Sequence, residues 1–274
     1  MAQIVTITNP LTGQPAQVDQ LEHTAQEIDD AIARALPGGA IDIASQNKAT
    51  ILKDSLDLYV STSGSDTTGD GSESNPFRTI QHAVDMIPPV LNGKRVIINV
   101  AAGTYDEDVV IQGKCASRGE RPIYINGASS KDDAVNYKVR SITASGTGMG
   151  SIQIRGFKFL GYEGIWDIGS YGDACFYIQN CILDSATKYG VYLADKPYSH
   201  ACIANSTISN KTTTAFLSEL GNILLVRNCT GSDNAVVFTS GLGSGFGGMI
   251  FNGGGNSISG TTAEVKYYGG QIFK

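Results

Sequence analysis

Ile154-Arg155-Gly156, Ile178-Gln179-Asn180, Ile203-Ala204-Asn205, Val226-Arg227-Asn228 and Ile250-Phe251-Asn252 repeat one pattern within the stretch from Ser151 to Asn256. In each segment a β-branched residue is followed by a spacer and then by Gly or Asn. The third residues follow one another at steps of 24, 25, 23 and 24 residues. A repeat of this length predicts a solenoid in which each unit adds one coil.

The repeated units also carry apolar residues two positions apart, as in Ile152/Ile154 and Leu224/Val226. This alternation predicts β-strands with one buried face, because a helical repeat would need apolar residues three and four apart. The predicted fold is therefore an all-β, parallel β-helix. Gly and Asn tolerate positive φ, so they are expected to turn the corner after each strand. Stacked corners would form a ladder, which we expect at Gly156, Asn180, Asn205, Asn228 and Asn252.

Bulk composition excludes several classes of function. Of 274 residues, 33 are Gly and 17% are charged, the latter below the usual value of about 25%, and both fit a turn-rich β repeat. A net charge of −6 gives no basis for expecting nucleic acid as a partner. Five cysteines without C-x-x-C spacing and three histidines predict no metal site, and no cofactor is expected. The cysteines are interpreted as small buried apolar residues, with disulfides between coils as the alternative.

No apolar stretch approaches 18 residues, so membrane insertion is not expected. Met1 to Pro15 lacks Lys and Arg and has no long apolar core, so no secretory signal peptide is expected. In the first residues of the same segment Ile4 and Thr6 alternate with Val5 and Ile7, and this alternation predicts a short strand or an extended arm. An arm with exposed apolar side chains requires a partner to cover it. We expect particle attachment through Ile4, Val5, Ile7, Pro10 and Leu11.

A helix of roughly twenty residues is predicted to follow, over residues 17–36. Its apolar positions are spaced by three and four residues, which is the pattern of a coiled-coil seam, and trimers fit this seam at least as well as dimers. The predicted seam residues are Val18, Leu21, Ala25, Ile28, Ile32 and Ala35. The alternative is a single amphipathic helix docked on the body. The predicted domains are an attachment arm with a trimerising helix (1–40), a linker (41–56) and a β-helix body (57–274).

A second, shorter helix is expected at the start of the body. Ser74 or Asn75 would cap its N-terminus and Pro76 would occupy its first turn. Its apolar face would contain Phe77, Ile80, Val84 and Ile87. A solenoid has an open core at each end, and this amphipathic helix is expected to cap one of them.

Two resemblances extend these expectations. Tyr59-Val60-Ser61, the run from Asn75 to Gln81, Val96–Val100 and Gly103-Thr104-Tyr105 resemble the opening of pectin-lyase-like right-handed parallel β-helix proteins, over about 57–274. That resemblance implies the handedness but little about function, because the scaffold carries lyases, hydrolases, tailspikes and inert fibres. The segment from Thr8 to Pro15, with the seam helix and Leu36–Gly39, is similar to N-termini of bacteriophage structural proteins. It implies a virion location, a homotrimer, and attachment to a capsid or tail protein.

Catalysis on a polysaccharide would require paired carboxylates or a calcium cluster with a basic residue. Glu163, Asp167, Asp173 and Asp184 lie in or near the long connections 161–173 and 184–199, and the last three are weak catalytic candidates. No catalytic motif of the known β-helix enzymes is matched.

Aromatic residues cluster in the same part of the chain. Tyr162, Trp166 and Tyr171 are candidates for binding a glycan, and the alternative is packing of connections onto the coil wall. The expected function is a virion structural protein, a trimeric fibre or appendage for decoration or adhesion to host-surface polysaccharide. The alternative is a tailspike depolymerase that cleaves such a polysaccharide near 161–199.

Overall fold

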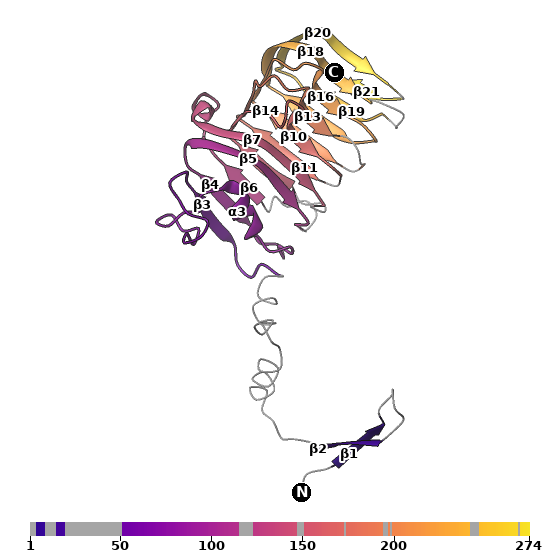
Figure 1. Cartoon of the computed structure of the whole chain (residues 1–274). Coiled ribbons are helices and arrows are strands. Elements are labelled where there is room, and N and C mark those ends of the chain that lie inside the picture. Colours follow the sequence, from indigo (N-terminus) through magenta and orange to yellow (C-terminus); the bar gives the residue numbers. More distant parts are fainter. Residues whose placement is uncertain are drawn as a thin grey trace. The chain divides into compact units, whose positions relative to one another are not determined.

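The computed structural model describes residues 4–8, 15–19, 51–114, 123–146, 151–172, 174–193, 197, 199–241, 247–267 and 269–274. The chain divides into two compact units, Met1–Ala49 and Thr50–Lys274. Figure 1 shows both units, and the larger of them contains the stacked strands of the body.

The first unit contains a pair of antiparallel strands. β1 (Ile4–Thr8) pairs with β2 (Pro15–Asp19), so that Val5 lies opposite Val18. The expected helix over 17–36 is therefore wrong for residues 17–19. There the backbone pairs with a β-branched-rich strand, and such residues favour strands over helices. The other predicted seam residues lie outside the described part of the chain, as do two predicted attachment residues: Leu21, Ala25, Ile28, Ile32, Ala35, Pro10 and Leu11.

The second unit is a parallel β-solenoid, which confirms the predicted class of fold. One wall is a nine-stranded sheet in the order β21-β19-β17-β14-β11-β8-β6-β4-β3. Its strands are β3 (Leu56–Val60), β4 (Val96–Val100), β6 (Ile123–Asn126), β8 (Ser151–Arg155), β11 (Cys175–Gln179), β14 (His200–Ala204), β17 (Ile223–Arg227), β19 (Met249–Asn252) and β21 (Gln271–Phe273).

A ten-stranded sheet forms the remaining wall of the solenoid. It contains β5 (Gly103–Gln112), β7 (Tyr137–Ser145), β9 (Lys158–Phe159), β10 (Trp166–Ser170), β12 (Ile182–Leu183), β13 (Tyr189–Leu193), β15 (Thr207–Ile208), β16 (Thr214–Ser218), β18 (Thr230–Ser240) and β20 (Ser257–Lys266). Figure 1 shows these strands stacking from β5 and β7 toward β18 and β20.

The core is built from columns of like residues in successive coils. Ile154 lies opposite Ile178, Ile178 opposite Ile203, and Ile203 opposite Val226, and all four are fully buried. Each coil therefore covers the apolar side chains of the coil before it, as the alternation in the sequence predicts.

Corner residues follow the strands of the nine-stranded sheet. Gly156, Asn180, Asn205 and Asn228 have φ values of 72°, 56°, 51° and 48°. Their backbone N–H groups link successive coils, as in the bond from Asn180 N to the carbonyl oxygen of Ala204 at 3.3 Å. The side-chain amide of Asn180 donates to the carbonyl oxygen of Ser129, at 2.9 Å.

The predicted corner at Asn252 is wrong. Asn252 lies in β19 opposite Val226, and the N–H of Asn228 donates to the carbonyl oxygen of Gly254 at 3.2 Å. In the other coils the accepting carbonyl belongs to the residue just before the next corner, so the corner here is Gly255, whose φ is 73°. The sequence pattern misplaced it because this corner lies three residues beyond Asn252.

The short helix at the start of the body is α3 (Ile80–Asp85), and Thr79 is its N-cap. The expected start near Ser74 or Asn75 is wrong, because the N–H of Asn75 bonds the carbonyl oxygen of Ser72 in a turn. The carboxylate of Glu107 instead accepts the N–H groups of Ile80 and Gln81, both at 2.8 Å. This places a negative charge at the helix N-terminus, where it is favourable. A 3₁₀ helix, η1 (Asp132–Asn136), also lies outside the sheets.

Candidate functional site

Five aromatic side chains meet on the wall formed by β10 and β13. We call Tyr162, Trp166, Tyr171, Tyr189 and Tyr192 the aromatic patch. The Trp166 ring stacks on Tyr162 at 4.9 Å and on Tyr192 at 5.4 Å between centroids, and it contacts the edge of Tyr171 at 5.5 Å. Tyr189 lies 4.9 Å from Tyr192. The three predicted glycan candidates therefore lie together, with two further tyrosines from the next coil.

Register and one glycine position these rings. Trp166 lies opposite Tyr189, and Gly169 lies opposite Tyr192. A Cβ atom at Gly169 would be 3.1 Å from the indole Nε1 of Trp166, which is tighter than ordinary contact. The missing side chain therefore leaves room for the indole ring to lie on the wall. The indole Nε1 donates to Thr143 Oγ1 at 3.4 Å, which holds the ring on its other side.

Tyr162 reaches the patch through a tight turn. Its N–H donates to the carbonyl oxygen of Trp166 at 2.8 Å, and the N–H of Ile165 donates back to the carbonyl oxygen of Tyr162 at 2.6 Å. Glu163 and Gly164 between them have positive φ values of 41° and 71°. This turn folds Tyr162 over Trp166.

Burial divides the patch into a centre and a contact surface. Trp166 is 9% exposed, whereas the four tyrosines are half-buried. Trp166 therefore supports the tyrosine rings, as the packing alternative expects, and part of each tyrosine side chain remains exposed. Tyrosine combines a rigid apolar face with a polar hydroxyl, a combination suited to recognition.

The residue after Trp166 points into the solenoid. Asp167 is fully buried, and its Oδ2 is 2.6 Å from the Nζ of Lys211, which is also fully buried. The ammonium group also donates to the carbonyl oxygen of Ser185 at 2.6 Å and to Thr187 Oγ1 at 3.0 Å. The Ser185 hydroxyl donates to the other oxygen of Asp167. Both charges are thus paired and hydrogen-bonded, as burial requires.

Burial controls the electrostatics of this pair. It raises the pKa of Asp167 to about 6, and the nearby ammonium group of Lys211 opposes that rise. Burial also lowers the pKa of Lys211, and Asp167 opposes that decrease. Each group therefore depends on the other to stay ionised inside the wall. The expectation that Asp167 faces an open groove is wrong, because its carboxylate is inside the coil.

Of the other predicted carboxylates, Asp184 lies close enough to Asp167 for its negative charge to be among the causes that raise the pKa of Asp167. Asp184 Oδ2 is 2.8 Å from Lys158 Nζ, in a partly exposed ion pair. Asp173 lies outside the described residues. Glu163 is exposed and raises the pKa of Arg140, as a minor contributor after Asp108, whose hydrogen bond is the largest cause.

Sequence reasoning missed Lys211 altogether. It searched for carboxylates and aromatics in the long connections, and Lys211 reaches Asp167 from 44 residues further along the chain. Nothing local distinguishes this lysine from the others, because its burial depends on which coils become neighbours.

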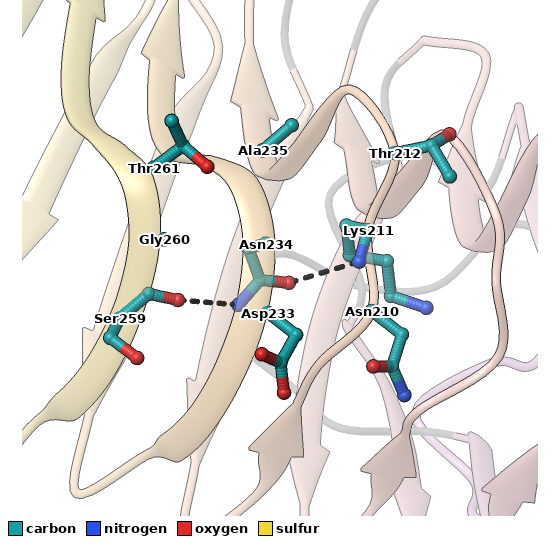
Figure 2. Close-up of a pocket in the computed structure, with 9 residues that line it drawn as sticks. All are labelled: Asn210, Lys211, Thr212, Asp233, Asn234, Ala235, Ser259, Gly260 and Thr261. Carbon is teal, nitrogen blue, oxygen red and sulfur yellow. Dashed lines mark hydrogen bonds between the residues drawn. The ribbon is translucent and has the colours of Figure 1, made fainter.

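A polar hollow of about 450 Å³ lies further along the same wall (Figure 2). Its lining residues come from three successive coils: Asn210, Lys211, Thr212, Asp233, Asn234, Ala235, Ser259, Gly260 and Thr261. Asn234 joins these coils, since its Oδ1 accepts from Lys211 N at 3.2 Å and its Nδ2 donates to the carbonyl oxygen of Ser259 at 3.1 Å (Figure 2). Amide, hydroxyl and carboxylate groups line the hollow.

Comparison with known proteins agrees with the fold. Residues 164–271 match the family model of right-handed β-helix regions. The matched segment contains most of the aromatic patch, Lys211 and the polar hollow. No curated protein and no solved structure matches the chain.

Two further observations concern the described residues only. They contain no cluster of three or more His, Cys, Asp or Glu side chains that would hold a metal ion. No helix in this part of the chain is long and apolar enough to cross a membrane.

Proposed function

We propose that this chain is a bacteriophage virion structural protein, a trimeric fibre or appendage subunit that adheres to polysaccharide on the host surface. The N-terminal unit would attach it to a capsid or tail protein, and the right-handed β-helix would present the binding surface. The observation that carries adhesion is the aromatic patch, in which three tyrosine rings contact a nearly buried tryptophan and a fourth, Tyr189, contacts Tyr192.

The chemistry of the wall supports a carbohydrate ligand. Tyrosine rings offer apolar faces for the C–H surface of a sugar, and their hydroxyl groups offer hydrogen bonds. The rings are held before binding, because Trp166 stacks with Tyr162 on one side and Tyr192 on the other. A preorganised surface loses little conformational entropy on binding, which favours affinity.

The carboxylates favour adhesion over cleavage. Glycoside hydrolysis requires two carboxyl groups about 5–9.5 Å apart on either side of the bond that breaks. Asp167 is inside the wall in an ion pair with Lys211, and Asp184 is paired with Lys158. Neither is positioned as a general acid beside the aromatic patch. The depolymerase alternative thus receives less support than binding without turnover.

The remaining parts of the proposal concern assembly. The hairpin of β1 and β2 would contact the particle, and residues 20–36 would hold three chains together through the predicted seam. Within the second unit, α3 packs with β3, β4 and β5 and buries Ile80, Ala83 and Val84. We propose that α3 caps the first coil, because an uncovered solenoid end would leave apolar side chains in water.

Tryptophan fluorescence provides a direct test, because Trp166 is the only tryptophan in the chain. The full chain would be titrated with purified bacterial capsular polysaccharides and teichoic acids. A binding polysaccharide is expected to change the intensity or wavelength of Trp166 emission. Tyr192→Ala is expected to weaken that binding by roughly 5–30-fold, because truncation of an aromatic anchor costs about 1–2 kcal/mol.

A matched control is Tyr267→Ala, since Tyr267 is 46% exposed but lies outside the patch. Its affinity is expected to equal that of the wild-type chain. Equal losses for both variants would show that the patch is not the binding surface. Release of sugar products from a bound polysaccharide would instead establish the depolymerase alternative.

A further inference from the structure

We propose that copies of this chain associate side by side through the outward face of the nine-stranded sheet, with the partner a second copy in the same orientation. This inference rests on the proposed trimeric assembly and identifies the surface that would form it in the body. The strands that carry this face, including β4, β6, β11, β14, β19 and β21, are labelled in Figure 1.

The face carries a continuous column of apolar and aromatic side chains, which we call the apolar strip: Ile97, Tyr124, Tyr177, Leu225, Phe251 and Phe273. Strand register aligns them, since Ile97 lies opposite Tyr124, Leu225 opposite Phe251, and Phe251 opposite Phe273. Gln153 and Cys202 complete the column between Tyr124 and Leu225. The strip thus crosses eight of the nine strands without a charged residue.

Alternation along each strand shows that the strip faces outward. The neighbours of its members in sequence, such as Ile98, Ile178 and Val226, are fully buried in the core. Successive residues of a strand point to opposite faces, so the strip residues lie on the outer face. Phe251 and Phe273 are 36% and 43% exposed, and their rings stack at 4.7 Å.

Most charge lies beside the strip, but the guanidinium of Arg95 lies 5.8 Å from the centroid of the Tyr124 ring, and Asp57 of β3 extends the column beyond Ile97. The next column on one side contains Ile223 and Met249, together with His200. Arg155 and Arg227 lie in the column on the other side. Interfaces between proteins have the same arrangement, in which charged residues are depleted from the centre and occur at the rim.

The dimensions of the whole outward face, the strip with its flanking columns, identify its partner. Seven steps between strands of about 4.8 Å give a length of about 34 Å, and strands of five residues at about 3.3 Å each give the face a width of about 16 Å. Their product is roughly 550 Å² for each copy, which reaches the roughly 500 Å² per partner that a specific interface needs. A partner must run along almost the whole body, and another copy of the same solenoid has that length.

Association through this face leaves the glycan site accessible. The aromatic patch belongs to β10 and β13 of the other sheet. Copies joined along the apolar strip would therefore each present an open patch. Cyclic assembly through one repeated surface is the usual way in which identical chains form closed oligomers.

Site-specific photo-crosslinking in the full chain tests the strip directly. p-Benzoylphenylalanine would replace Phe251, a change that keeps an aromatic ring at the site. The control places it at Val110, which is 45% exposed on β5 of the other sheet. Irradiation is expected to yield covalent dimers and trimers from the Phe251 site, at least tenfold more than from the Val110 site. Equal yields at the two sites would overturn the proposal.

Light scattering on Leu225→Glu supplies a second measurement, with Val110→Glu as the control. The Leu225 variant is expected to dissociate at a protein concentration at least tenfold above that of the control. Equal dissociation would count against the strip. Crosslinking at Phe251 without polysaccharide binding would leave the strip proposal standing and remove adhesion. Polysaccharide binding reported by Trp166 fluorescence, without crosslinking at Phe251, would support adhesion and overturn the strip proposal.

Discussion

Lys211→Met removes the ammonium group from the interior of the solenoid and leaves the Asp167 carboxylate without its ion-pair partner. Methionine is nearly as long as lysine and unbranched, so the change leaves little empty space. The effect on the free energy of unfolding should therefore report the lost charge pair more than lost packing. Ser185 would still donate its hydroxyl to the carboxylate.

The expected loss of stability at neutral pH is about 3–5 kcal/mol, because one buried charge is left uncompensated. Lys158→Met is the matched control. Lys158 and Asp184 form an ion pair at a similar distance, 2.8 Å, but their side chains are 28% and 34% exposed. Pairs that remain in contact with water contribute about 0–1 kcal/mol, so this variant should lose no more than that.

The loss of stability in the Lys211→Met variant should become smaller as the pH falls. Burial holds the pKa of Asp167 above its ordinary value of 3.8, and removal of Lys211 removes a group that opposed this rise. The folded variant therefore takes up a proton at a higher pH than the unfolded chain does. Its free energy of unfolding rises as the pH falls through the folded pKa toward 3.8. Below that range the buried acid is neutral.

Urea denaturation followed by circular dichroism, at about pH 5 and about pH 7.5, measures these differences. Asp167→Asn combined with Lys211→Met should recover part of the loss at the higher pH, since the double variant buries no charge. A Lys211→Met variant as stable as Lys158→Met would refute the reasoning. So would a loss that is the same at both pH values.

Two further predictions concern the corners and the thiols. Gly156→Ala should destabilise the protein by more than the 1–2 kcal/mol typical of a left-handed residue, because its Cβ would be 2.0 Å from the carbonyl oxygen of Ala128. Gly113→Ala, with φ of 65° and open space around its Cβ, should lose only about that amount in the same denaturation assay. Burial raises the pKa of Cys181 to about 12 and of Cys229 to about 11. Both thiols should therefore resist Ellman's reagent at about pH 8 in the folded protein and react with it in urea. Peptide mapping would identify the labelled cysteines. Rapid labelling of either thiol in the folded protein would contradict the prediction.

The solenoid was predictable because its signal is local and repeated. Each coil independently shows a β-branched pair and a corner residue, so several weak signals agree on one period. The aromatic cluster was likewise visible, because Tyr162, Trp166 and Tyr171 are close in sequence. What the sequence did not show was that Trp166 is nearly buried and that Tyr189 and Tyr192 share its surface.

The errors arose where neighbours in space decide the outcome. Asp167 was expected in a groove, but within β10 its side chain is fully buried and pairs with Lys211, which comes from another coil. The corner at Asn252 was misplaced because the pattern of three residues recurs three positions before the true corner, Gly255. The helix expected from Gln17 is wrong for residues 17–19, since pairing with β1 overrides the helical spacing of Val18.

Strand register has a consequence for how such a chain can change over time. Ile125 lies opposite Ile154 and Phe251 opposite Phe273, so coils of 29 and 22 residues align with equal accuracy. An insertion or deletion between two strands is therefore absorbed within its own coil and does not displace the residues of the next one. Segments that carry recognition, such as the turn from Tyr162 to Trp166, are free to lengthen, shorten or be exchanged while the wall that supports them is inherited unchanged.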